Sequence, residues 1–143
     1  MEPMTATLTS TGSTAAVIVT HQRAELLRAS LEQVVHQTHP VQWVVVVDNG
    51  AEDAVRELVE SMAGDRGVYV PSETNLGGAG GFALGFLTAL SLGADAVWCA
   101  DDDGRPADHT VLAELYRVAE ANRLHEVSPA VCNINAVSYT HLR

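Results

Sequence analysis

The stretch Ala96–Gly104 has the sequence AVWCADDDG, an apolar, strand-like run that ends in three adjacent aspartates. At ~4 Å each pair of carboxylates repels by about 1 kcal/mol in bulk water, and by more near protein. An Asp-x-Asp pair on an extended backbone points two side chains the same way, which suits a shared Mg²⁺ or Mn²⁺. The alternative is a solvated acidic turn in which Asp103 and Gly104 merely end the strand.

Other strand-like runs lie on both sides of this stretch, and helical stripes of apolar residues separate them. Strands are expected at 15–20 (AAVIVT), 43–47 (WVVVV), 67–70, 96–100 and 127–133. Helices are expected at 22–37, 52–62, 79–92 and from an N-cap at Asp108 to about Asn122. This alternation predicts an α/β fold: a parallel sheet with helices on both faces.

In such sheets ligands bind beyond the carboxyl ends of the strands. Polar residues follow four of the expected strands, at Thr20–His21, Asp48–Asn49, Asn75–Gly78 and Asp101–Asp103. Four clusters at one rim indicate a binding site more strongly than any one of them does. Taken singly, Asp48 could cap the next turn or bind a base or ribose, and Arg23 could contact a ligand or be solvated.

Glycine is concentrated in the segment Thr74–Gly85 (TNLGGAGGFALG). Each glycine lowers helix stability by roughly 0.5–1 kcal/mol relative to alanine. Their presence therefore indicates that a backbone free of side chains is required here. Close approach of a ligand to a helix N-terminus is one reason, and we expect it for Asn75–Gly78. Gly81 and Gly85 are expected to pack against the sheet. The register matches neither a Rossmann phosphate loop nor a Walker loop.

The composition and charge argue against nucleic-acid-binding, secreted and membrane-spanning proteins. The chain has 143 residues, 47% of them hydrophobic, and a net charge of -10. The chain shows no basic face, so we expect no nucleic-acid partner. Cys99 and Cys132 lie in apolar runs and are expected to be buried free thiols. Residues 1–14 resemble a flexible tail rather than a signal peptide, and no apolar run could span a bilayer, so a cytoplasmic location is expected.

These motifs together resemble the family 2 inverting glycosyltransferases of the GT-A fold. The resemblance covers about Ala15–Asn135, and the segment Asn75–Gly104 is similar to the actinobacterial galactofuranosyltransferases that initiate the galactan of cell-wall arabinogalactan. It implies a donor, UDP-galactofuranose, and an acceptor, a polyprenyl-diphosphate-linked glycan at the inner face of the plasma membrane. By position it implies a uridine pocket at Thr20, Arg23 and Asp48, ribose and diphosphate contacts at Asn75, Gly77, Gly78 and Asp102, and a divalent metal, Mg²⁺ or Mn²⁺, at Asp101 and Asp103.

The sequence also departs from this family. The catalytic base and a metal-binding histidine of such enzymes lie in a second half, beyond this chain, so residues 15–135 are expected to form only the nucleotide-sugar-binding half and to be inactive alone. Residues 136–143 (AVSYTHLR) match a translated sequencing adapter and are expected to be a non-native tail. The alternatives are a rhamnosyltransferase or another family 2 enzyme using a dTDP- or UDP-sugar, and a non-catalytic nucleotide-binding module.

Overall fold

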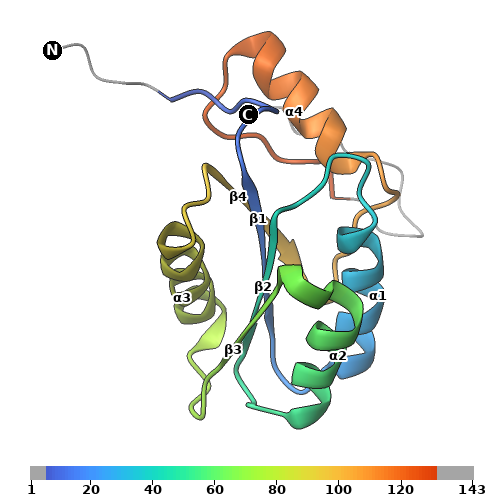
Figure 1. Ribbon diagram of the computed structural model, residues 1–143, viewed down its shortest axis with the longest axis vertical. Helices are drawn as coiled ribbons and strands as arrows, with labels where there is room; N and C mark the ends of the chain where they lie inside the picture. Colours follow the sequence, from blue (N-terminus) through green and yellow to red (C-terminus); the bar gives the residue numbers. More distant parts are fainter. Residues whose placement is uncertain (1–5, 132–143) are drawn as a thin grey trace, which may run out of the picture.

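The computed structural model describes residues 6–131 and contains one four-stranded parallel sheet in the order β3-β2-β1-β4 (Figure 1). The strands are β1 (Thr14–Thr20), β2 (Trp43–Asp48), β3 (Gly67–Pro71) and β4 (Ala96–Asp101). β1 and β2 are rich in β-branched residues and buried on both faces, as central strands of a parallel sheet require. The predicted α/β fold class is confirmed.

Helices cover both faces of this sheet (Figure 1). They are α1 (Ala24–Val35), α2 (Asp53–Ala63), α3 (Gly77–Ser91) and α4 (Val111–Asn122), with a short 3-10 helix at Gly64–Arg66 before β3. α1 and α2 lie on one face and α3 on the other, while α4 lies near the amino ends of the strands. None of the helices within residues 6–131 has the length and hydrophobicity needed to span a membrane.

The core has two layers because successive strand residues point to opposite faces of the sheet. Val44 and Val46 of β2 pack toward α1 and α2, and Val45 and Val47 pack toward α3. α3 lies close to β1, since a Cβ added at Gly85 would lie 2.3 Å from Cγ1 of Val17. The predicted packing role of the later glycines in α3 is therefore confirmed.

Three expectations about secondary structure are wrong. α3 begins at Gly77, so two glycines expected in a turn form the first turn of the helix. α4 begins at Val111, and Asp108 does not cap it: Oδ1 of Asp108 accepts hydrogen bonds from the N–H (2.8 Å) and hydroxyl (2.6 Å) of Thr110, which closes a turn before the helix. The described part of the expected fifth strand, 127–131, is not a strand; it contains Pro129, which lacks an N–H for a ladder. Its last two residues lie outside the described chain.

Cys99 is exposed, contrary to the expectation of a buried thiol. β4 pairs only with β1 among the described strands, so it forms the edge of the sheet. Trp98 and Ala100 point into the layer under α1 and α4, and Cys99 therefore points to the other face. α3 packs over β1 and β2 and leaves this position uncovered. Cys132 lies outside the described residues.

Part of the segment expected to be a tail contacts α4 (Figure 1). The N–H of Leu8 donates to the carbonyl of Leu124 (3.0 Å), and the hydroxyl of Ser10 donates to the carboxylate of Glu120 (2.7 Å). These contacts lie at the amino ends of the strands, opposite to the rim where the candidate site residues lie.

Candidate functional site

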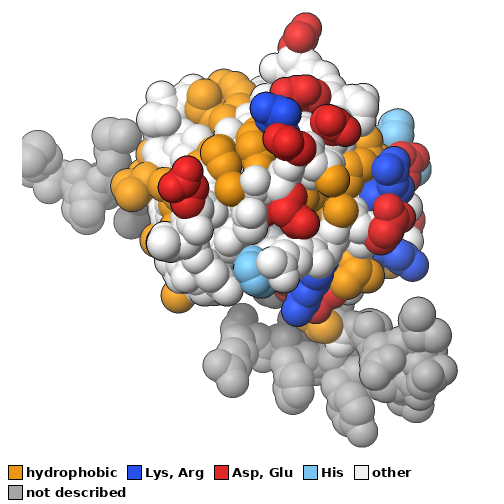
Figure 2. Space-filling view, turned by 90° about the horizontal axis from the view of Figure 1, so that it is seen from below, with side chains coloured by type: hydrophobic (Ala, Val, Ile, Leu, Met, Phe, Trp, Pro, Cys, Tyr) orange, Lys and Arg blue, Asp and Glu red, His pale blue; other side chains and the backbone are white. Residues whose placement is uncertain are grey.

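The carboxyl ends of the strands bring the predicted polar clusters to one rim of the molecule. In the parallel ladders Thr20 is level with Asp48 on one side, and its neighbour Val19 is level with Asp101 on the other. The view from below in Figure 2 shows this end of the molecule, where acidic side chains outnumber the basic ones. The rim therefore combines residues that are far apart in sequence, as the sequence predicted.

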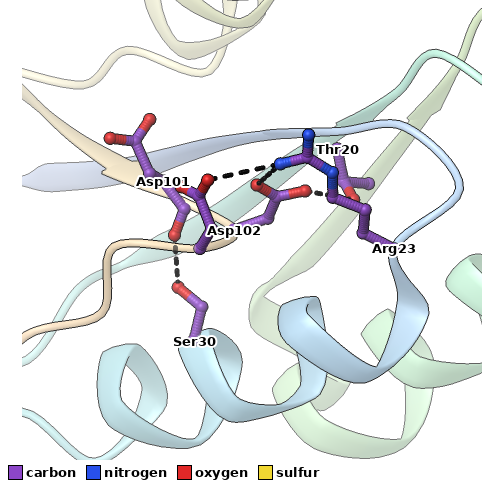
Figure 3. A network of polar contacts seen from close by, with 6 residues as sticks. Thr20, Arg23, Ser30, Asp101 and Asp102 are labelled. Atoms are coloured by element: carbon purple, nitrogen blue, oxygen red, sulfur yellow. Dashed lines mark hydrogen bonds and ion pairs between the residues drawn. The ribbon is translucent and has the colours of Figure 1, made fainter.

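A buried polar network joins the ends of β1 and β4 (Figure 3). The hydroxyl of Thr20 donates to Oδ2 of Asp102 at 3.0 Å, and both side chains are buried. Nη1 of Arg23, which is half exposed, lies 3.5 Å from Oδ1 of Asp102 and 3.3 Å from Oδ2 of Asp103. Thr20 and Arg23, both predicted to bind a nucleotide, thus each contact Asp102, a third predicted binding residue.

Asp101 and Asp103 flank Asp102 and are exposed. The Asp101 carboxylate points away from Arg23 (Figure 3) and has no hydrogen-bond or ion-pair partner among residues 6–131. Its backbone is held instead, because the hydroxyl of Ser30 on α1 donates to the Asp101 carbonyl at 2.8 Å. Desolvation, followed by the negative charges of Asp103 and Asp102, raises the pKa of Asp101.

Asp48 lies in a closed environment. Its side chain is 0% exposed. Oδ1 accepts the N–H of Gly50 at 2.9 Å, and Oδ2 accepts the N–H of Glu52 at 2.7 Å and the hydroxyl of Tyr69 at 2.8 Å. Burial, together with the hydrogen bond to Asp48, raises the pKa of Tyr69. In this structure Asp48 closes the turn from β2 into α2, so a contact with a base would add to a structural role.

The start of α3 is open, in contrast. Gly77 has a φ of +70°, which favours glycine, and its N–H donates to Oδ1 of Asn75 at 2.9 Å. A Cβ added at Gly78 would meet no atom within 4 Å. The first-turn N–H groups of a helix lack partners within the helix and carry partial positive charge. The exposed turn Asn75–Gly78 can therefore accept an anionic ligand against its backbone.

Asn49 and Ser30 belong to this rim, and the sequence alone did not assign them a role. Asn49 is 4% exposed, and its side chain bonds the backbone at Leu76 and Gly77. Its position directly after β2 placed it in the rim cluster with Asp48, but gave no indication that it would bond the start of α3. No sequence feature marked Ser30, because it is one polar residue within an amphipathic helix. Its contact with the carbonyl of Asp101 exists only in the folded chain.

Two residues at the rim have backbone conformations that non-glycine residues rarely adopt. Gln22 follows β1 with a φ of 54°, and Ala51 follows β2 with a φ of 47°. Such conformations cost of order 1–3 kcal/mol each and persist where the surrounding structure holds them. Their position after the two central strands adds to the case for a site at this rim.

No group of three or more histidine, cysteine or acidic side chains within residues 6–131 is arranged to hold a metal ion. Of the three aspartates at the end of β4, Asp101 and Asp103 are exposed and could offer their carboxylates to a cation. A cavity of about 280 Å³ lies elsewhere, between the start of β4, α4 and residues 125–127. Its walls include Trp98 and Leu112, and it lies away from the rim where parallel sheets bind ligands.

The chain belongs to glycosyl transferase family 2, whose family model matches residues 15–140. It is similar to the galactofuranosyltransferase GlfT1 of Mycolicibacterium smegmatis, with 53% identity over 128 residues that cover 90% of this chain and 42% of the relative. It is equally similar to GlfT1 of Mycobacterium tuberculosis H37Rv, with 53% identity over 127 residues, 87% of this chain and 41% of the relative. The chain thus spans about two-fifths of the length of these curated relatives.

Solved structures share the fold. Staphylococcus aureus TarS 1-349, in complex with UDP, matches with a TM-score of 0.61 at 20% identity over 78% of this chain and 33% of its own. The mannosyltransferase PcManGT of Pyrobaculum calidifontis, in complex with GDP-Man and Mn²⁺, matches with a TM-score of 0.58 at 24% identity over 78% and 34%. The expected GT-A-like arrangement is confirmed by these matches.

Proposed function

We propose that this chain forms the donor-binding part of a glycosyltransferase that transfers galactofuranose from UDP-galactofuranose to a polyprenyl-diphosphate-linked glycan. One observation carries the proposal: the exposed carboxylates of Asp101 and Asp103 and the open turn Asn75–Gly78 lie at the same rim of the sheet. A divalent cation and backbone N–H donors are two means of stabilising the negative charge of a nucleotide diphosphate. The identity of 53% to galactofuranosyltransferases supports the choice of sugar.

The residues have separate roles in this proposal. Arg23 lines the uridine pocket with an exposed side chain, while Thr20 and Asp48, whose side chains are buried, support its wall from within. Asp102 lies near the ribose, and its contacts hold β1 to β4. The turn with Asn75, Gly77 and Gly78 runs along the ribose and diphosphate, because no side chain blocks its backbone. Arg23 is half exposed and provides the positive charge next to Asp102 and Asp103.

Asp101 and Asp103 fit a divalent cation, Mg²⁺ or Mn²⁺. Their carboxylates lie on the exposed side of a strand end, while the intervening Asp102 points inward. Oxygen ligands are those that both ions prefer, and Asp101 has no cationic partner among residues 6–131. When bound, the cation would stabilise negative charge on the leaving diphosphate. Two carboxylates leave coordination positions for the donor.

We assign the base that deprotonates the acceptor to no residue of this chain. The two exposed aspartates are used for the cation, and Asp48 and Asp102 are held by internal donors. Inversion by direct displacement needs a base beside the acceptor hydroxyl. A lipid-linked acceptor would place the full-length enzyme in the cytoplasm against the inner face of the plasma membrane.

Calorimetric titration with UDP, dTDP and CTP, with Mn²⁺ and with EDTA, tests the proposal. We expect UDP with Mn²⁺ to bind most tightly, and EDTA or Asp103→Ala to weaken binding by about tenfold, since one ionic ligand is worth roughly 1–2 kcal/mol. Asp65→Ala removes an exposed aspartate far from the rim and is the matched control. Unchanged affinity in EDTA would refute the metal role, and tighter binding of dTDP would favour a different sugar donor.

A further inference from the structure

We propose that Asn49 is a positioning residue that holds the first turn of α3 in place for donor binding. The inference rests on the proposed function, because it concerns how the turn Asn75–Gly78 reaches a diphosphate. Asn49 is itself tied to the end of β1, since its N–H donates to the carbonyl of Thr20 at 2.9 Å. Its side chain, 4% exposed, then extends toward the start of α3.

The Asn49 side chain forms two opposite hydrogen bonds with consecutive residues. Oδ1 accepts the N–H of Leu76 at 3.2 Å, and Nδ2 donates to the carbonyl of Gly77 at 3.2 Å. Both distances are at the long end for such bonds. A primary amide of this length provides one acceptor and one donor group, whereas aspartate provides acceptors alone and leucine provides neither. Asparagine is therefore the residue that this pair of backbone groups requires.

The glycines of α3 make room for this contact. A Cβ added at Gly81 would lie 2.6 Å from Cγ1 of Val19 and 3.4 Å from Nδ2 of Asn49. The helix can therefore approach both the strand and the amide. The N-cap residue, Leu76, has an apolar side chain and cannot cap the helix with a hydrogen bond. Asn49 and the exposed Asn75 are the side chains that bond the backbone of this first turn among the described residues.

A consequence for ligand binding follows from this geometry. The N–H groups of Gly78 and Ala79 lie in the first turn of α3 and have no intrahelical acceptor. Their direction depends on the orientation of the first turn, and the buried amide of Asn49 sets that orientation relative to β1 and β2. Preorganised donors bind an anion more tightly than mobile ones, because the ordering has already taken place on folding.

The test combines hydrogen exchange with calorimetry on the full chain. In Asn49→Ala the hydrogen-bonded amides among residues 76–80, above all that of Leu76, should exchange about tenfold faster. UDP in the presence of Mn²⁺ should bind about tenfold more weakly, since two hydrogen bonds are lost. Asn49→Asp keeps the acceptor for Leu76 but places an oxygen against the carbonyl of Gly77. It should give the same pattern and replaces Asn49→Ala if that variant does not fold.

Gln37→Ala is the matched control. Gln37 is a second buried amide that binds backbone, with Oε1 accepting the N–H of Leu112 at 2.9 Å and Nε2 donating to the carbonyl of Asp108 at 2.8 Å. It holds the start of α4 instead, so its loss should reduce stability without changing exchange at 76–80 or UDP affinity.

The outcomes separate the inference from the proposed function. Faster exchange with unchanged UDP affinity in the Asn49 variants would show a purely structural contact and overturn the positioning role. Unchanged exchange at 76–80 would overturn the contact itself. Failure of the unsubstituted chain to bind UDP would refute the proposed function and this role with it, whatever the exchange rates of the variants.

Discussion

Asp48 and Asp101 end two parallel strands of the same sheet, yet their carboxylates have opposite environments. Asp48 is 0% exposed and accepts three hydrogen bonds from Gly50, Glu52 and Tyr69. Asp101 is exposed, and its carboxylate accepts no hydrogen bond from residues 6–131; desolvation and the neighbouring aspartates raise its pKa. The first carboxylate stabilises the fold, and the second is partly disfavoured in its charged form by its surroundings.

The same contrast occurs among the glycines of α3. Gly85 is buried against Val17, whereas Gly78 faces open space. A polar group left without an internal partner contributes little to stability but can bind a ligand. A group closed off by internal contacts contributes to stability but is not accessible to a ligand. Substitutions can distinguish the two kinds of position. A substitution at a closed position should lower the free energy of unfolding, and one at an open position should mainly weaken ligand binding.

The largest effect is expected at Asp48. Asp48→Ala should lower the free energy of unfolding by about 3 kcal/mol or more, because three donors lose their acceptor at roughly 1–3 kcal/mol each. Urea unfolding followed by circular dichroism measures this. Asp103→Ala, at an exposed position two residues beyond β4, should stay within about 0.5 kcal/mol of the parent. Equal losses at both sites would break the comparison.

A smaller effect is expected at the glycines. Gly85→Ala should lower the free energy of unfolding by about 1–3 kcal/mol, because the new Cβ would press against Val17 in the core. Gly78→Ala should leave it unchanged or raise it by up to about 1 kcal/mol, since alanine favours the helix. Thermal unfolding of the two variants compares them directly.

A larger substitution at Gly78 tests whether this open position contributes to UDP binding. Gly78→Val should fold but bind UDP more weakly, because its side chain would enter the space in front of the first turn. A folded Gly78→Val protein with normal UDP affinity would show that this space is not used by the donor.

The smallest effect is expected at Ala51, beside the closed carboxylate. Its φ of 47° suits glycine better than alanine. Ala51→Gly should raise the free energy of unfolding by roughly 0.5 kcal/mol, the difference between relieved strain and greater freedom of the unfolded chain. Urea unfolding detects this shift. A loss of stability would mean that the Ala51 methyl group makes a stabilising contact that outweighs the strain.

Much of the fold was predictable because it depends on local patterns. β-branched runs specified β1 and β2 nearly to the residue, and apolar stripes of helical spacing located α1 and α2. The rule that parallel strands present their carboxyl ends together was enough to bring the clusters to one rim. The helix start at Gly77 was missed, because glycine propensity argues against a helix that packing on the sheet stabilises.

The errors concern contacts between distant parts of the chain. Val127–Val131 has an apolar pattern, but a strand also needs a neighbouring strand to accept its hydrogen bonds, and these residues have none in the described structure. Cys99 lies in an apolar run, but β4 lies at the sheet edge, where α3 does not cover it. Local sequence contains no information on which helix covers which strand.

The sequence by itself determined the element order, the sheet type and the set of polar residues at the strand ends, because period and turn chemistry are properties of neighbouring residues. The tertiary structure alone decided which of those residues are open. Asp48 is closed because Tyr69 and the α2 N-terminus meet it, and Asn49 acquires its role because α3 returns to the end of β2. Burial and hydrogen-bond partnership arise from the packing of elements distant in sequence, and that packing separates the internally bonded carboxylate of Asp48 from the exposed carboxylate of Asp101.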